Sequence, residues 1–155
     1  MKRVLFVCLG NICRSPAAEG ILRQKLRKAG LSAQIEVDSA GTGDWHVGNP
    51  PDSRMRSAAQ ARGYDLSGLR GRQVSTADFA AFDLILAMDN SNLSNLAKVK
   101  PANGRAELDL FLRRYGLAVD QVPDPYYGGD DGFENVLDLL EQACDALVAE
   151  LEGRL

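Results

Sequence analysis

Residues 3–16 read RVLFVCLGNICRSP and combine a continuous apolar run, a short polar loop and the start of a helix. The β-branched and aromatic residues of Val4–Val7 are typical of a parallel strand that is covered on both faces. The Gly10–Asn11 pair favours a turn, and Ser15–Pro16 predicts a helix N-cap followed by proline at the first helical position. This stretch therefore predicts a buried strand, Arg3–Cys8, that passes through a loop into a helix.

Strand and helix patterns alternate through the rest of the sequence. A second buried strand is predicted at Leu84–Ala87, and weaker strand patterns lie at Gln34–Val37 and Ala106–Leu110. The other expected elements are a loop at Ala40–Asp52, a helix at Ser53–Arg62, a turn at Thr76–Ala80, a helix at Asn90–Leu96 and a long final helix with an Asp131–Glu134 capping box. Alternating β and α units predict an α/β fold, in which helices cover both faces of a parallel sheet. A length of 155 residues predicts one domain, residues 1–155.

Composition and charge exclude several classes of protein. The 18 Lys and Arg residues against 21 Asp and Glu residues give a formal net charge of −3, which argues against nucleic-acid partners. The one histidine, His46, rules out a His-rich metal site and is expected on a surface loop. Three cysteines, an odd number, argue against a secreted disulfide framework.

The apolar run near the N-terminus is too short for a secretion signal or a membrane span. Val4–Leu9 holds six apolar residues, against roughly 7–15 for the core of a signal peptide and about 20 for a membrane-spanning helix. We therefore expect a cytoplasmic, unprocessed protein without membrane insertion.

The loop Cys8–Ser15 carries the strongest chemical signal. Ligands of parallel α/β folds bind beyond the carboxyl ends of the strands, and Cys8 lies at such an end. Backbone N–H groups at a helix start converge on anions, and Arg14 adds a planar fork of donors that suits two phosphate oxygens. The backbone of Gly10 is free to take a positive φ, and Asn11 tolerates the left-handed region, as a tight loop requires. The positive field of these donors favours a thiolate, so Cys8 is the candidate nucleophile for phosphorus.

The block Val7–Pro16 resembles the signature loop of the low-molecular-weight protein tyrosine phosphatases. The similarity continues, in the family's order, through Asp38–Thr42, Trp45 and Asp124–Tyr127, so it covers essentially the whole chain. The resemblance implies a three-layer fold with a four-stranded parallel sheet, helices on both faces and the phosphate-binding loop after the first strand. It also implies hydrolysis of phosphotyrosine monoesters through a phosphocysteine on Cys8, with neither a metal nor a cofactor.

The resemblance also assigns roles to the other site residues. Asp124, which lies between two prolines, would be the general acid for the leaving group and then the base for water. Asn11, Ser15 and Ser39 resemble the residues that support the loop, and the Ser15 hydroxyl would also stabilise the departing thiolate. The expected phosphate-binding residues are Leu9, Gly10, Asn11, Ile12, Cys13, Arg14 and Ser15. The expected substrate-binding residues are Ile12, Trp45, Tyr126 and Tyr127.

The two remaining cysteines receive different interpretations. Cys13 lies five residues after Cys8, and in the family this spacing suggests a reversible disulfide that shields the nucleophile from irreversible oxidation. The alternative for Cys13 is a small buried side chain behind the loop. Cys144 falls within the final helix and is expected in the core.

Three alternative functions share parts of this site. Arginine phosphatases of the family tend to carry a small polar residue where Ile12 stands and to lack the paired tyrosines that follow Asp124. Arsenate reductases of this scaffold need further cysteines on a movable segment, and Gln73–Asn103 contains none. A phosphocysteine carrier would not need Arg14 or the acid. The expected partner is a phosphotyrosyl protein, such as the tail of a bacterial tyrosine kinase, and the sequence is compatible with a monomer or a weak homodimer.

Overall fold

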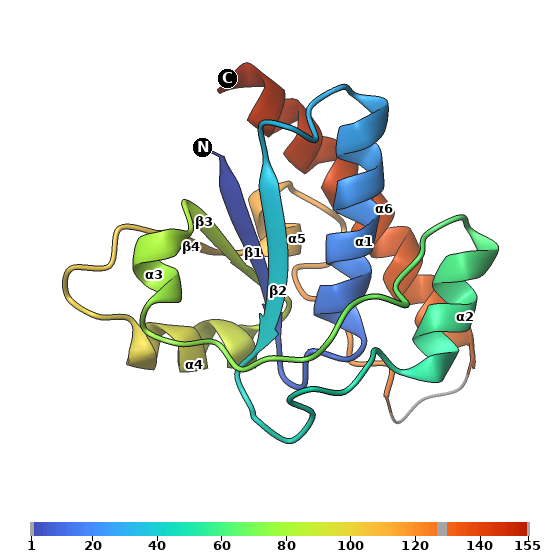
Figure 1. Cartoon of the computed structure of the whole chain (residues 1–155), viewed down its shortest axis with the longest axis horizontal. Helices are drawn as coiled ribbons and strands as arrows, with labels where there is room; N and C mark the ends of the chain where they lie inside the picture. Colours follow the sequence, from blue (N-terminus) through green and yellow to red (C-terminus); the bar gives the residue numbers. More distant parts are fainter. Residues whose placement is uncertain (1, 127–129, 155) are drawn as a thin grey trace.

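The computed structural model describes residues 2–126 and 130–154, in which strands and helices alternate along the chain (Figure 1). The elements are β1 (Arg3–Cys8), α1 (Arg14–Lys28), β2 (Glu36–Gly41), α2 (Ser53–Ala61), α3 (Asp78–Ala81), β3 (Leu84–Ala87), α4 (Asn90–Val99), β4 (Glu107–Leu110), α5 (Phe111–Arg114) and α6 (Asp130–Gly153). The four strands form one parallel sheet in the order β2-β1-β3-β4. The predicted α/β fold with a four-stranded parallel sheet is confirmed.

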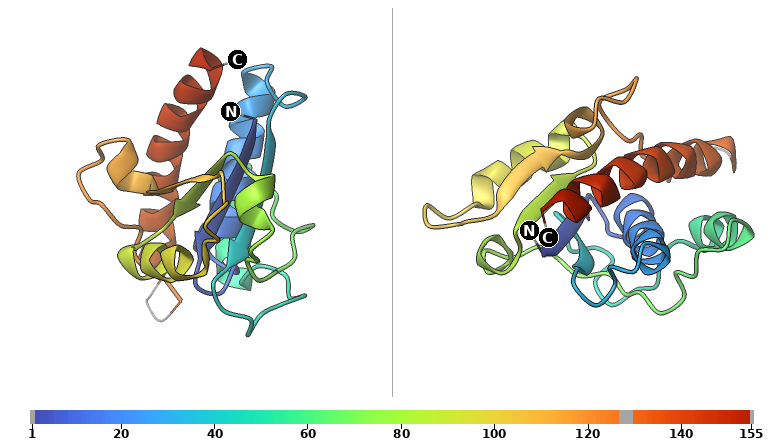
Figure 2. Two further views of the ribbon diagram at one scale, coloured as in Figure 1. Left: turned by 90° about the vertical axis from the view of Figure 1, so that its left-hand side faces the viewer. Right: turned by 90° about the horizontal axis from the view of Figure 1, so that it is seen from above.

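Helices cover both faces of the sheet, which explains why the central strands are apolar throughout. Alternate side chains of β1 enter opposite cores, with Val4 and Phe6 on one face and Leu5 and Val7 on the other. The first core includes α1, α5 and α6, and the second includes α3 and α4. In the view from above, α1 and α6 lie side by side along the sheet (Figure 2). The buried stripe of α6 is Val136, Leu137, Leu140, Ala143, Leu147 and Leu151.

Several predicted boundaries are wrong, and the turn expected at Thr76–Ala80 overlaps the short helix α3. Two of the differences lie at the end of the second strand and at the start of the final helix. The second strand extends to Gly41, although the sequence predicted a loop from Ala40. The parallel register pairs Gly41 with Cys8, and its backbone bonds to Arg72 and Val74 extend the pairing to the strand end. At the other boundary, α6 begins at Asp130, so Asp131 lies inside the helix and is not its N-cap.

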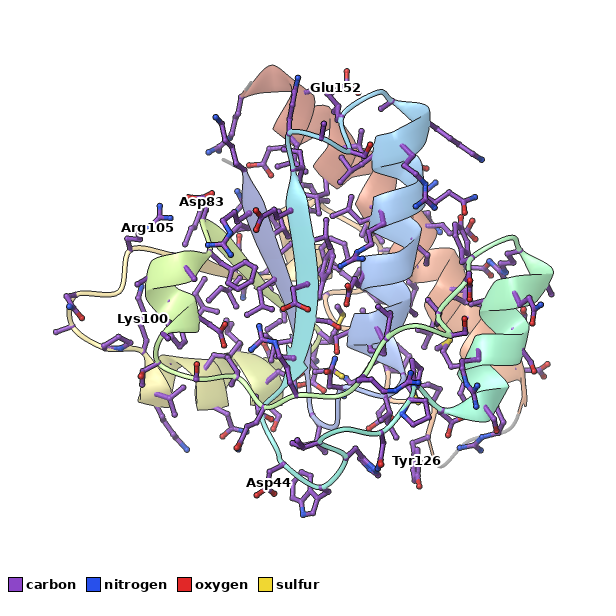
Figure 3. All side chains as sticks on the ribbon, viewed as in Figure 1. Asp44, Asp83, Lys100, Arg105, Tyr126 and Glu152 are labelled. Carbon is purple, nitrogen blue, oxygen red and sulfur yellow. The ribbon has the colours of Figure 1, made fainter. Side chains whose placement is uncertain are left out.

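Parallel strands bring their carboxyl ends to one edge of the sheet, where the loops after β1 and β2 meet. Figure 3 places Asp44, from the loop after β2, and Tyr126, from the segment before α6, at this same end of the molecule. The loop that carries the chemical signal therefore meets distant parts of the chain here. No helix among the described residues is long and apolar enough to cross a membrane.

Candidate active site

The loop between β1 and α1 turns sharply at Asn11, whose φ of 58° lies in the left-handed region. Asparagine tolerates this conformation better than most residues, so this part of the prediction is confirmed. Gly10, whose backbone is free to take a positive φ, does not adopt one. Gly10 matters through space instead, because a Cβ there would lie 3.0 Å from Cδ2 of His46. The loop thus packs directly against the segment after β2.

The predicted N-cap at Ser15 is also wrong, since α1 begins at Arg14 and the residue before it is Cys13. The hydroxyl of Ser15 is used within the loop: its Oγ lies 3.0 Å from Sγ of Cys8 and accepts a hydrogen bond of 2.8 Å from the Asn11 side chain. The backbone N–H of Asn11 also points at Sγ, at 3.3 Å. Cys8 is only 2% exposed. Its sulfur therefore meets the Ser15 hydroxyl and the Asn11 N–H and has little contact with solvent.

The amide of Asn11 joins three separate segments beneath the loop. Its Nδ2 donates to Oγ of Ser15 at 2.8 Å and to Oγ of Ser39, on β2, at 3.0 Å. Its Oδ1 accepts a 3.0 Å bond from the backbone N–H of Arg72. The structure therefore brings together all three residues that the resemblance named as loop support. Gly41 adjoins them, because a Cβ there would lie 2.7 Å from the Leu9 carbonyl oxygen.

Arg14 is a buried residue, 2% exposed, and its guanidinium donates hydrogen bonds to two acceptors. Its Nη1 donates to Oδ2 of Asp89 at 2.6 Å and to the Val122 carbonyl at 3.0 Å. Its Nη2 lies 3.6 Å from Oδ2 of Asp124. Burial alone would lower the pKa of Arg14, but the negative charge on Cys8 and the two carboxylates raise it above its ordinary value.

Asp89 is a site residue that the sequence analysis missed. It is the N-cap of α4, where Oδ1 accepts a 2.8 Å bond from the N–H of Asn92, and its other oxygen holds Arg14. Its place just after the buried strand Leu84–Ala87 is the signal that points to it, because that strand also ends at the ligand-binding edge.

A cavity of about 360 Å³ opens over Cys8. Its lining consists of Cys8, Leu9, Gly10, Ile12, Cys13, Arg14, Trp45, His46, Asp124 and Tyr126. His46 lies on a surface loop after β2, as expected, and its ring also lines the cavity, with its centroid 6.3 Å from that of Tyr126. Trp45 lines the mouth while 67% exposed. Tyr127, also predicted to bind substrate, lies outside the described residues.

Asp124 lies on the segment before α6 with its side chain 38% exposed. Its Oδ1 accepts the backbone N–H of Tyr126 at 3.0 Å, while Oδ2 faces Arg14. Arg54, an exposed residue that the sequence does not link to Asp124, holds this segment. Its guanidinium donates to the Tyr126 carbonyl at 3.0 Å and lies 5.4 Å from the centre of the Tyr126 ring. Asp52 fixes Arg54 through both carboxylate oxygens.

The other two cysteines are free and buried. Burial, and then the charge of Asp52, raises the pKa of the Cys13 thiol well above its ordinary value. Cys144 is fully buried in α6, as predicted, and burial also raises its pKa. Neither environment favours a thiolate.

Comparison with known proteins gives a consistent result. A family model described as low molecular weight phosphotyrosine protein phosphatase matches residues 3–154. A protein of that name from Schizosaccharomyces pombe is 52% identical, over 84% of this chain and 85% of its own. The solved structure of a protein tyrosine phosphatase from Entamoeba histolytica superposes with a TM-score of 0.93, at 42% identity and over 100% of both chains. An arginine phosphatase of Drosophila superposes with a TM-score of 0.88, at 36% identity and over 97% of this chain and 98% of its own.

Proposed function

The chain belongs to the low molecular weight phosphotyrosine protein phosphatase family, and from this premise we propose that it hydrolyses phosphotyrosine in proteins through a phosphocysteine on Cys8. One observation carries the proposal: the sulfur of Cys8, the guanidinium of Arg14 and the carboxylate of Asp124 line one cavity of about 360 Å³. We further propose that residues 1–155 form one phosphatase domain.

The first step forms a bond between Sγ of Cys8 and phosphorus and breaks the bond from phosphorus to the aryl oxygen. Arg14 and the loop N–H groups bind the non-bridging oxygens, whose charge they stabilise in the transition state. Asp89 keeps the guanidinium aimed at the cavity. Asp124 transfers a proton to the departing oxygen, since a phenoxide leaves poorly without one.

The second step reverses these roles at the same atoms. Asp124, now a carboxylate, takes a proton from water as the water oxygen bonds to phosphorus. The bond from phosphorus to sulfur breaks, and the thiolate of Cys8 departs. The Ser15 hydroxyl, 3.0 Å from Sγ, stabilises this thiolate by a hydrogen bond, and inorganic phosphate leaves.

The walls of the cavity favour a flat aromatic group over a guanidinium. Ile12 and Trp45 supply apolar surface, and Tyr126 offers a ring for offset stacking. The similarity to an arginine phosphatase of Drosophila makes phosphoarginine the substrate to compare. We propose a phosphotyrosyl protein as partner, and Tyr127 as a second aromatic contact.

Cys13 is proposed to protect the nucleophile. Peroxide oxidises the Cys8 thiolate to a sulfenic acid, and the thiol of Cys13 displaces water from it to form a disulfide. Burial raises the pKa of Cys13, so its protonated thiol does not compete with Cys8 for peroxide. Cys13 must lose this proton to attack the sulfenic acid, and the proton leaves in the water that is released. Mass spectrometry of peroxide-treated protein should find a peptide that links the two cysteines, and its absence would exclude the role.

Hydrolysis of an aryl phosphate in EDTA tests the proposal. Wild type should turn over, Cys8→Ser should be inactive, and Asp124→Ala should lose about 10²–10⁴-fold in kcat. Asp120→Ala, which removes an exposed carboxylate four residues before Asp124, is the matched control and should keep wild-type rates. Faster turnover of phosphoarginine than of phosphotyrosine would favour the arginine phosphatase. Labelling of Cys8 without release of phosphate would favour a carrier.

A further inference from the structure

Glu19 is a buried carboxylate on α1 that the steps above do not use. It is 2% exposed and does not line the cavity. Its Oε1 accepts a 2.7 Å hydrogen bond from the Ser39 hydroxyl, and its Oε2 lies 2.5 Å from the guanidinium of Arg23. A buried charge is costly to desolvate, and these two donors stabilise the carboxylate. The hydrogen bonds continue from Glu19 through Ser39 to Asn11 in the phosphate-binding loop.

Each bond in the chain from Glu19 to the loop has a fixed donor. A carboxylate only accepts, so Ser39 gives its one proton to Glu19 and presents lone pairs to the Asn11 amide. The orientation of that amide is fixed from the other side, because its oxygen accepts the Arg72 N–H. Its Nδ2 therefore donates to both serine hydroxyls, at 3.0 Å to Ser39 and 2.8 Å to Ser15.

The proton of Ser15 is then left for the nucleophile. The Ser15 oxygen accepts from Asn11, so its own proton must go elsewhere. Two acceptors lie within reach, Sγ of Cys8 at 3.0 Å and the Ala40 carbonyl at 3.4 Å, and the sulfur is closer. We propose that Glu19 is a positioning residue whose carboxylate directs the chain Ser39–Asn11–Ser15 so that the Ser15 hydroxyl donates to the Cys8 sulfur. The inference rests on the proposed function, which makes that sulfur the nucleophile.

The variant Glu19→Gln tests this direction at almost constant shape. The guanidinium of Arg23 donates to Oε2, so it selects the oxygen of the new amide, and the NH₂ group then faces the Ser39 hydroxyl. The Ser39 hydroxyl then has no acceptor at residue 19. If its proton turns toward Asn11, it faces the Nδ2 donor of Asn11, and the two donors repel each other. Simple electrostatics predicts the opposite outcome, because removal of a nearby negative charge favours a thiolate. The two explanations therefore differ in sign.

The measurement is the rate of Cys8 alkylation by iodoacetamide as a function of pH, followed at the Cys8 peptide by mass spectrometry. In Glu19→Gln the pH midpoint should rise by about 0.5–1 unit, which corresponds to about 3–10-fold less thiolate at a fixed lower pH. Glu150→Gln is the matched control, because Glu150 also accepts from a hydroxyl, that of Tyr115, and from an arginine, Arg114, but sits near the end of α6. Its midpoint should equal that of wild type.

Two further variants secure the result. In Glu19→Gln with Arg23→Met, the amide oxygen is free to face Ser39, so the midpoint should return toward wild type. Glu19→Asp keeps the charge but withdraws it by one methylene, and its midpoint should also rise, which covers the case in which Glu19→Gln does not fold. An unchanged or lowered midpoint in both Glu19 single variants would overturn the inference. Alkylation needs no turnover, so an inactive wild type would refute the phosphatase function and leave this test intact.

Discussion

Asp89→Asn separates the two roles of the residue that holds Arg14. In wild type, Oδ1 of Asp89 caps α4 and Oδ2 accepts from Arg14 at 2.6 Å. Asparagine has one oxygen for these two donors, and as a good N-cap residue it should keep the helix cap. The variant then loses a charge-assisted hydrogen bond to a guanidinium that is only 3% exposed, a loss of about 1.5–3 kcal/mol.

Because Arg14 must be oriented before it can bind the phosphoryl oxygens, the same loss should appear in catalysis. We expect kcat/KM for an aryl phosphate to fall by about 10–100-fold. Steady-state kinetics and urea unfolding, on the same preparations, measure the two effects.

Asn92→Ala is the matched control for the cap. The Asn92 side chain accepts the Asp89 backbone N–H at 3.2 Å, so its removal weakens the capping box and leaves the contact with Arg14 in place. We expect about 1 kcal/mol of destabilisation and wild-type activity. If Asp89→Asn keeps wild-type activity, then the bond from Asp89 does not orient Arg14 for catalysis and the reasoning about Arg14 is refuted.

Three further predictions concern packing, loop position and pH. Gly41→Ala places a Cβ 2.7 Å from a carbonyl oxygen of the phosphate-binding loop, so urea unfolding should show a loss of about 1–3 kcal/mol, accompanied by lower activity. Arg54→Ala removes the bond to the Tyr126 carbonyl and should lower kcat/KM severalfold with the unfolding midpoint nearly unchanged. Hydrogen bonds from Arg114 lower the pKa of Glu150 below its ordinary 4.5. The stability from this pair is thus present above pH 4.5 and lost as pH falls through the lower folded value, so wild type should lose more stability on acidification than Glu150→Gln.

The nucleophilic loop could be predicted from the sequence because its signal is local. Cys8, Arg14 and the turn at Asn11 lie within seven residues, between a strand and a helix that each have a clear pattern. The left-handed φ at Asn11 was predicted for the same reason, since asparagine tolerates it.

Other parts of the site depend on partners that are distant in the chain. The bond from Arg14 to Asp89 spans 75 residues, and the bond from Glu19 to Ser39 spans 20. The hydrophobic periodicity of the sequence does not indicate which distant residues form such pairs. Ser15 was misassigned as a helix cap because its hydroxyl has a better use, as a partner of the Cys8 sulfur. His46 has no local signal for a cavity wall, because its place there depends on its contacts with Gly10 and Tyr126.

The central claim is that phosphate passes through a covalent bond to Cys8. Its most direct test is intact-mass analysis of Asp124→Ala, quenched with alkali during turnover of an aryl phosphate with a weakly basic leaving group and kept in alkali, where a phosphocysteine is stable. Such a leaving group departs without a general acid, whereas hydrolysis of the intermediate still lacks its base, so one phosphoryl group should accumulate per chain and map to Cys8. A chain of unchanged mass while the aryl alcohol is released, or a phosphoryl group on another residue, would contradict the account.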